Sequence, residues 1–251
     1  MRRIPKFVAA LVAVLAVAGC GQRADTGSQQ LTVLAAASLT EAFEEVAARF
    51  EQQHPGVSVR FDFQGSSTLA EQVVQGRQAD VLASADPATM AEVVRTGATA
   101  GQSATFATNR LAIAVPPGNP AGIRSLADLG DPGAVVVVCA PQVPCGAATE
   151  EVERAAGVRI QPASEENDVK SVLRKVVAGE ADAGLVYRTD VRAAGGSVEG
   201  IEFPESARAV NDYPIAALAD APNPELADRF ADFVRGPAGR EVLAAHGFGA
   251  P

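Results

Sequence analysis

Residues 31–50, LTVLAAASLTEAFEEVAARF, join a short apolar run to a helical repeat. Leu31 to Ala36 has the length of a short buried strand, and apolar residues then recur three and four positions apart from Leu39 to Phe50. The sequence His54-Pro55-Gly56 stops that repeat. The stretch therefore predicts a strand followed by an amphipathic helix, which is the basic unit of an α/β fold.

The same alternation of strands and helices continues along the chain. Strands are predicted at 57–63, 80–84, 111–115, 134–139, 184–187 and 213–218. Helices are predicted at 69–74, from Pro87 onward, at 147–156 and 169–177, and around Phe230 and Val242. The β-branched run at 134–139 is typical of a strand covered on both faces. Repeated strand–helix units predict parallel sheets with helices on both faces.

Residues 1–19 predict a lipoprotein signal peptide rather than a part of the fold. Basic residues in positions 2–6 precede an apolar run of 12 residues, Phe7 to Ala18, which is shorter than the ~20 residues of a membrane-spanning helix. The run ends Val17-Ala18-Gly19-Cys20, which resembles a bacterial lipobox, in which the lipid is carried on the cysteine. A plain secretory signal with an accidental cysteine is the alternative. Residues 20–30 are expected to form a polar tether.

Composition and charge describe a globular, acidic, exported chain. The 251 residues are 47% hydrophobic and 20% charged, so disorder is excluded. Removing the leader leaves 232 residues, enough for one large domain or two lobes of about 100 residues. These retain 18 Lys+Arg and 30 Asp+Glu, a formal charge of −12. This balance argues against nucleic-acid partners and against electrostatic binding to a membrane, so the lipid anchor is the one membrane contact expected.

Two cysteines remain besides Cys20. Cys139 and Cys145 flank the sequence APQVP, in which Pro141 and Pro144 force a bent connection. In a compartment that permits disulfides this pair favours a bridge, and two buried thiols are the alternative.

Four strand-to-helix turns are the candidate ligand sites, because α/β folds bind ligands at the carboxyl ends of their strands. In the first turn Ser38 and Glu41 have the spacing of a capping box. In the second, Ser66 follows Gly65 at the end of a predicted strand. Small residues let a ligand approach the backbone, and the free amides at a helix N-terminus attract anions.

The third turn is Val143-Pro144-Cys145-Gly146, and the fourth is Asn167-Asp168-Val169. Asn167 is predicted to cap its helix, which leaves the Val169 amide at the second helical position free. Tyr187 ends its strand and can add a phenol donor. A core tyrosine with a satisfied hydroxyl is the alternative.

In this order, the motifs resemble those of the periplasmic molybdate-binding proteins of ABC importers. The resemblance covers nearly all of residues 31–249. Its segments are AAASLT (35–40), GSSTLA (65–70), AD (79–80), SAD (84–86), VPCG (143–146), NDV (167–169), GLVY (184–187), YP (213–214) and GP (236–237).

The resemblance implies an α/β, two-lobed type II periplasmic binding protein with a hinged cleft, each lobe a mostly parallel sheet flanked by helices. Lobe 1 would comprise residues 31–106 plus 213–251, and lobe 2 residues 107–212. The oxyanion, molybdate or tungstate, would be held without direct metal ligands and without a cofactor. The implied donors are the hydroxyls and amides of Ser38 and Ser66, the amides of Cys145 and Val169, and the Tyr187 hydroxyl.

The resemblance also implies a monomer that serves an ABC permease from the cell envelope, lipid-anchored on the outer side of the cytoplasmic membrane. Two residues depart from the family pattern. Gly65 stands where a third serine is common, which leaves open whether Ser66 or Ser67 is the donor. Cys145 stands where a small alanine is usual.

Three other functions use the same residues differently. A sulfate- or phosphate-binding protein would share the turn chemistry. Tyr187 and Tyr213 could hold ferric iron, but the serine turns would then lack a role. An exported serine hydrolase with Ser38 or Ser66 as nucleophile would need a base.

The sequence offers such an enzyme little support. His54 and His246 are the only histidines, both occur at predicted helix ends, and no G-x-S-x-G motif is present. They are also too far from the cysteines in sequence to suggest a zinc site. No enzymatic activity is therefore expected.

Overall fold

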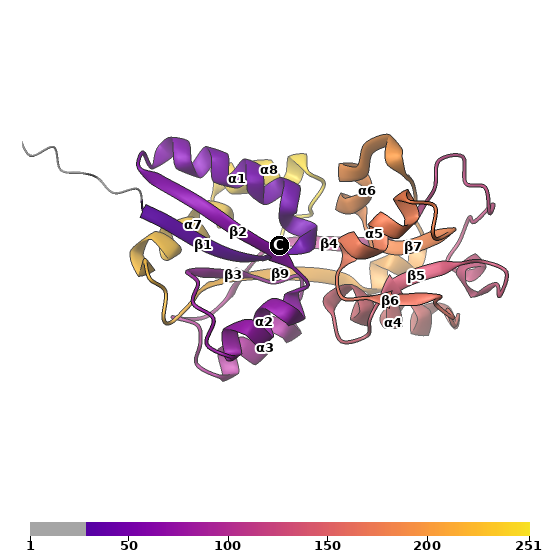
Figure 1. Cartoon of the computed structure of the whole chain (residues 1–251), viewed down its shortest axis with the longest axis horizontal. Coiled ribbons are helices and arrows are strands. Elements are labelled where there is room, and N and C mark those ends of the chain that lie inside the picture. Colours follow the sequence, from indigo (N-terminus) through magenta and orange to yellow (C-terminus); the bar gives the residue numbers. More distant parts are fainter. Residues whose placement is uncertain (1–28) are drawn as a thin grey trace, which may run out of the picture.

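In a computed structural model that describes residues 29–251, the chain forms two lobes side by side, joined by two long strands (Figure 1). The predicted signal peptide, Cys20 and most of the tether lie outside the described residues. The tether is predicted two residues too long, because Gln29 and Gln30 already pair with the next strand and begin β1. The Gln29 amide donates to the Gly56 carbonyl at 2.8 Å.

The strands are β1 (Gln29–Ala36), β2 (Val57–Gln64), β3 (Val81–Ala83), β4 (Ala104–Val115), β5 (Val136–Cys139), β6 (Ser164–Glu166), β7 (Ala183–Tyr187), β8 (Glu199–Ile201) and β9 (Val210–Ala217). The helices are α1 (Thr40–Gln53), α2 (Ser66–Val74), α3 (Pro87–Arg95), α4 (Pro144–Ala156), α5 (Val169–Val177), α6 (Arg188–Ala194), α7 (Pro224–Arg235) and α8 (Pro237–Ala245). None of these helices combines the length and the apolar character that crossing a membrane requires. Each predicted strand and helix has its counterpart, with ends that differ by up to three residues, except that β4 begins at Ala104, seven residues before the predicted strand at 111–115.

The strands follow the order β2-β1-β3-β9-β4-β7-β5-β6, with β8 beside β4. In the first lobe β1 is parallel to β2 and β3, and in the second β5 is parallel to β6 and β7. The antiparallel strands β4 and β9 run between the lobes. β4 pairs with β9 over Ala104–Arg110 and then with β7 over Leu111–Ala114. The mixed α/β architecture therefore agrees with the predicted fold class.

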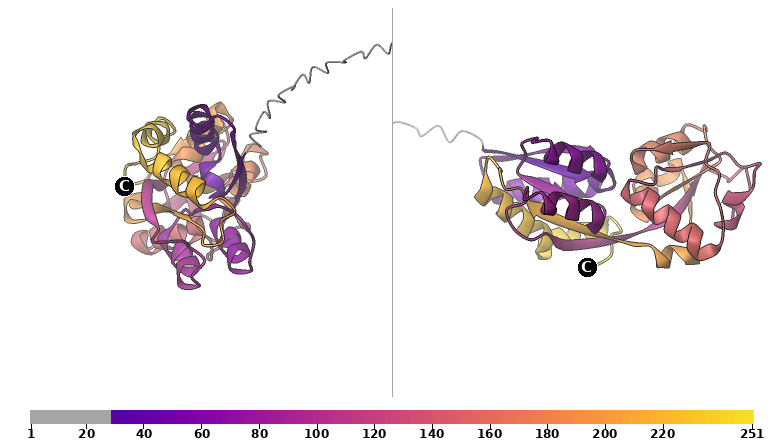
Figure 2. Two further views of the ribbon diagram at one scale, coloured as in Figure 1. Left: turned by 90° about the vertical axis from the view of Figure 1, so that its left-hand side faces the viewer. Right: turned by 90° about the horizontal axis from the view of Figure 1, so that it is seen from below.

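Each lobe has its own hydrophobic core. Buried residues of the first lobe come from two stretches, 31–107 and 213–248, while the second lobe buries residues from 111 to 209. The core changes from one lobe to the other within β4 and within β9. The view from below shows both connections on the same side of the molecule, as a hinge requires (Figure 2). The lobe boundaries at 106/107 and 212/213 remain a prediction.

Candidate functional site

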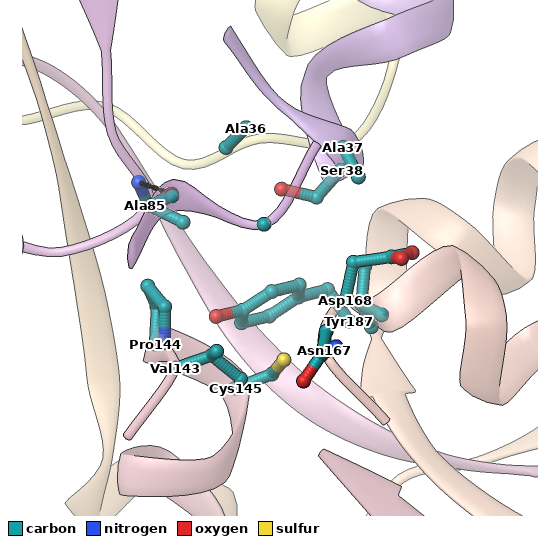
Figure 3. Close-up of a pocket in the computed structure, with 13 residues that line it drawn as sticks. Ala36, Ala37, Ser38, Ala85, Val143, Pro144, Cys145, Asn167, Asp168 and Tyr187 are labelled. Atoms are coloured by element: carbon teal, nitrogen blue, oxygen red, sulfur yellow. Dashed lines mark hydrogen bonds between the residues drawn. The ribbon is translucent and has the colours of Figure 1, made fainter. Parts of the chain in front are cut away.

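A small pocket lies between the lobes and is lined by residues that follow the carboxyl ends of the parallel strands (Figure 3). Its lining residues are Ala36, Ala37, Ser38, Gly65, Ser66, Ala85, Val143, Pro144, Cys145, Asn167, Asp168, Val169 and Tyr187. The five residues predicted from the sequence to donate to a ligand are all among them. The cavity volume of ≈ 20 Å³ suits a small inorganic ion rather than the organic ligands that fill pockets of about 300–1,000 Å³.

Ser38 reaches the pocket from a 3₁₀ turn, Ala37–Leu39, inserted between β1 and α1. The predicted capping box is wrong, because this turn moves the start of α1 and leaves Leu39 at the cap position. The Ser38 hydroxyl instead lies 2.9 Å from the Tyr213 hydroxyl and points toward the cavity (Figure 3). Ser38 is buried.

Ser66 is the first residue of α2 and is buried. Its Oγ accepts a 3.0 Å hydrogen bond from the Ala85 amide, so the serine side chain is held against the end of β3. The next serine, Ser67, donates its hydroxyl to the Gln142 carbonyl of the other lobe at 2.7 Å. The structure therefore brings Ser66, and not Ser67, into the pocket.

Gly65 permits the close approach of the two lobes. A Cβ atom at this position would lie 2.1 Å from the Asn167 carbonyl oxygen, a distance that no side chain tolerates. The glycine that replaces a serine of the family pattern therefore has a steric role where the lobes meet.

Two helices of the second lobe point their N-termini at the pocket. Cys145 is the second residue of α4, which begins three residues earlier than predicted, and Val169 is the first residue of α5. The prediction of Asn167 as cap is wrong, because Asp168 caps α5 by accepting from the Ser171 amide at 2.8 Å. Amides in a first turn have no intrahelical partner and lie at the positive end of the helix dipole.

Cys139 and Cys145 are joined in the structure. Their sulfur atoms are 2.07 Å apart and their Cα atoms 5.6 Å apart. The link ties the last residue of β5 to the first turn of α4, next to the cavity (Figure 3). The structure therefore favours the predicted disulfide over two free thiols.

Tyr187 closes one side of the pocket with its ring and points its hydroxyl into it (Figure 3). This residue is buried, and within residues 29–251 its hydroxyl has no hydrogen-bond partner. Burial raises the pKa of the phenol well above its ordinary value, so the group stays protonated and can donate. An unpaired buried hydroxyl costs roughly 1–3 kcal/mol, a cost that an oxygen-rich ligand would remove.

The pocket offers donors without a full positive charge. Lysine and arginine are absent from its lining residues. The Asp168 carboxylate points away from the cavity and is bonded to Ser171 (Figure 3). Lys170, beside the pocket, makes ion pairs with Glu41 of the other lobe at 2.8 Å and with Asp190 at 3.2 Å. Such a site can hold a small anion by hydrogen bonds and helix dipoles.

The groups that a serine hydrolase would need do not meet here. His54 bonds to the Phe50 carbonyl and His246 to Glu45, and neither lines the pocket. Ser38 and Ser66 therefore have no histidine base beside them. In residues 29–251, no group of three or more His, Cys, Asp or Glu side chains is arranged to hold a metal ion.

Sequence reasoning missed the groups that hold the two serines. Tyr213 and the Ala85 amide contact hydroxyls that lie 175 and 19 residues away in the chain. Ala85 and Tyr213 were both in reach of the sequence, because SAD at 84–86 and YP at 213–214 belong to the same motif set. Nothing in the sequence pairs either residue with its serine.

Comparison with known proteins identifies a matching family and close sequence relatives. The family model of bacterial extracellular solute-binding proteins matches residues 31–249. The molybdate-binding protein ModA of Mycobacterium tuberculosis is 46% identical, over 96% of this chain and 97% of that protein. ModA of Escherichia coli is 31% identical over 93% of each chain.

Solved structures share the fold. The periplasmic molybdate-binding protein of Azotobacter vinelandii superposes with a TM-score of 0.78 at 22% identity, covering 88% of this chain and 99% of that one. The sulfate-binding protein SubI of Mycobacterium tuberculosis gives a TM-score of 0.75 at 19% identity, covering 88% and 86%. At these identities the likeness concerns the fold alone.

Proposed function

The chain belongs to the bacterial extracellular solute-binding proteins, and we propose that the solute it captures is molybdate, and tungstate as well, for an ABC importer. The names of its relatives support molybdate, since proteins 46% and 31% identical over nearly their full lengths are named for binding it. Tungstate is included because it has nearly the same charge and radius as molybdate.

The convergence of neutral donors on one buried cavity is the observation that carries the proposal. We assign the oxyanion to the hydroxyls of Ser38, Ser66 and Tyr187 and to the backbone amides of Ser38, Ser66, Cys145 and Val169, all from residues that line the pocket. A hydrogen bond to a charged group contributes about 1.5–3 kcal/mol net, so several can offset the desolvation of a dianion. The acidic surface does not oppose this, because charges in ordinary salt are screened within about 8–10 Å.

Sulfate and phosphate are the competing ligands. The fold is shared with a sulfate-binding protein, and the same donors would serve a smaller tetrahedral anion. Donors fixed by backbone geometry measure size, however, so sulfate would leave some of them unpaired. Calorimetric titration of the mature protein with molybdate, tungstate, sulfate and phosphate tests this. Tighter binding of sulfate or phosphate than of molybdate would contradict the proposal.

The site assignment predicts the effect of removing single hydroxyls. Ser38→Ala and Ser66→Ala should each weaken molybdate by about 1.5–3 kcal/mol, roughly ten- to hundredfold or a little more, because an anion oxygen loses a charge-assisted donor. Ser206→Ala is the matched control. This serine is also buried, but its hydroxyl bonds to Phe203, away from the lining residues. Retained affinity in both pocket variants would overturn the assignment.

The family is extracellular, and we further propose that Cys20 anchors the protein by a lipid on the outer side of the cytoplasmic membrane, where it serves a permease as a monomer. The lipobox-like sequence ending at Cys20 supports this. The full-length protein should fractionate with membranes, whereas Cys20→Ala should be released or mislocalised. The intact mass of the native protein provides the second measurement. An unmodified N-terminus would contradict the anchor.

A further inference from the structure

We infer that Tyr213 is a positioning residue: its hydroxyl fixes the Ser38 hydroxyl as a donor toward the pocket, so that the site favours oxyanions that carry no proton. The inference rests on the proposed anion-binding function and concerns a residue that does not line the cavity. It follows from which atoms around Tyr213 can accept a hydrogen bond.

Tyr213 is fully buried in β9, between the two lobes. Its hydroxyl lies 2.9 Å from the Ser38 Oγ and 3.5 Å from the side-chain nitrogen of Asn109. The Tyr187 hydroxyl is a third polar neighbour, but it makes no hydrogen bond of good geometry. Burial raises the pKa of the phenol, so the hydroxyl keeps its proton. That proton must therefore be donated to one of its neighbours or remain unpaired.

The orientation of the Asn109 amide decides whether Ser38 or Asn109 accepts this proton. Its Oδ1 accepts from the Arg110 amide at 2.9 Å, and its Nδ2 donates to the Thr189 hydroxyl at 2.8 Å. Both bonds turn the NH₂ group, which cannot accept, toward Tyr213. Because the Tyr187 hydroxyl forms no hydrogen bond, the acceptor in hydrogen-bonding position for the Tyr213 proton within residues 29–251 is the Ser38 oxygen.

The bond from Tyr213 fixes the direction in which the Ser38 hydroxyl donates. Its oxygen accepts from Tyr213, so its own proton is free to point into the cavity, where Figure 3 shows the hydroxyl. The Ala85 amide has the same effect on Ser66: the Ser66 oxygen accepts from this amide, so the Ser66 proton is free to be donated to a ligand. Both serines are thus donors before any ligand arrives, and no hydroxyl has to reorient on binding.

Ligand selectivity follows from this arrangement. A fully deprotonated oxyanion accepts from both serines, whereas hydrogen phosphate carries an O–H group that needs an acceptor. Each serine oxygen already accepts one hydrogen bond and directs its own proton into the cavity, so a phosphate O–H group aimed at either serine would meet a donor. Tyr187 is then the lining hydroxyl whose oxygen has no other partner and could take that proton. Hydrogen phosphate would then lose the Tyr187 donor or leave its own proton unpaired, both at a cost in affinity.

A double-mutant cycle on molybdate affinity tests the inference. Tyr213→Phe keeps the ring that packs edge-on against Phe106 and Phe248, and it removes only the hydroxyl. It should weaken molybdate about tenfold in the wild-type chain but less than twofold in the Ser38→Ala background, because its effect passes through Ser38. Tyr187→Phe is the matched control. It removes a hydroxyl that faces the cavity itself and should have a similar effect in both backgrounds.

Two readouts separate positioning from stability. Thermal unfolding of the apo variants reports any loss of folding, and the ratio of molybdate to hydrogen phosphate affinity should fall in Tyr213→Phe, because Ser38 can then rotate and accept. An equal loss from Tyr213→Phe in both backgrounds, or an unchanged ratio, overturns the inference while leaving the proposed function intact. If the wild-type chain prefers another oxyanion, the proposed function fails and the cycle is run with that anion. If it binds none, both fail.

Discussion

A single residue behind the pocket, Asp190, supports the backbone of Tyr187. It is completely buried at the start of α6, where one carboxylate oxygen accepts from the Tyr187 amide at 3.0 Å and the other pairs with Lys170. Burial raises the pKa of this carboxyl from 3.8 to about 6, although Lys170 and the Tyr187 amide act in the opposite direction. Asp190 thus couples the backbone of the pocket tyrosine to the ion pairs between the lobes.

This raised pKa predicts a pH-dependent term in stability. Between 3.8 and about 6 the folded chain holds more protons on Asp190 than the unfolded chain. The proton bound to Asp190 therefore stabilises the folded state fully at low pH, and this contribution to the free energy of unfolding is lost as the pH rises through about 6. Asp190→Asn lacks the term, so its free energy of unfolding relative to wild type should rise across this window by roughly 2–3 kcal/mol. Denaturant titrations of both proteins at several pH values measure this difference, and parallel stability profiles would contradict the prediction.

Helix α4 depends on a covalent link for the placement of its first turn. Cys145 lies in that turn and is tied to Cys139 at the end of β5. Gly146 makes the turn possible, because a Cβ there would lie 1.9 Å from the Ala140 carbonyl oxygen. The cystine and the glycine together hold the first turn of α4, with Cys145, beside the cavity.

Breaking the link should therefore affect stability and binding together. Cys139→Ala and Cys145→Ala should each lower the free energy of unfolding by about 2 kcal/mol, since either removes the same small loop. Both should also weaken molybdate, because the Cys145 amide is less firmly held. Similar losses in the two variants are the internal control. Two titratable thiols in the unfolded, non-reduced wild-type protein would rule the bridge out.

The two lobes of the molecule are closed over the pocket. Contacts across the gap include the ion pair of Lys170 with Glu41, the bond from Ser67 to the Gln142 carbonyl, and the approach of Gly65 to Asn167. The first lobe contributes the two serines, and the second contributes Tyr187 and the two helix N-termini. A ligand held by both lobes shifts the hinge equilibrium toward closure by its differential affinity for that state.

A side chain at Gly65 should hold the lobes apart. Gly65→Ala places a methyl group against the Asn167 carbonyl and should weaken molybdate by roughly tenfold or more, because the closed state becomes less accessible. Small-angle scattering with saturating molybdate should show a larger radius of gyration than for the wild type. Gly101→Ala is the control, since its Cβ would meet no atom within 4 Å. Wild-type affinity and compaction in Gly65→Ala would contradict the steric role.

Most of the strands and helices, and the turns that line the pocket, could be predicted from patterns along the chain, whereas β6, α6 and β8 were not predicted. Apolar periodicity is a local signal, so the strand and helix at residues 31–50 could be predicted, and so could the alternation along the rest of the chain. The motif order pointed to Ser38, Ser66, Cys145, Val169 and Tyr187, which all line the pocket. The positions of these elements and turns could be predicted because they depend on residues that are close together in the chain or on motifs that stand in sequence order. The role of the five residues as ligand donors stays a prediction.

The contacts that hold those residues could not be predicted from the sequence and are visible only in the folded chain. Ser38 is not a cap, because a 3₁₀ turn displaces the helix start, and its partner Tyr213 lies 175 residues away. Ser66 rather than Ser67 enters the pocket because the Ala85 amide holds it there. The antiparallel paths of β4 and β9 between the lobes likewise follow from pairing between distant strands. Contacts between residues so far apart in the chain produce no local sequence pattern, because the two partners meet only when the lobes fold and close.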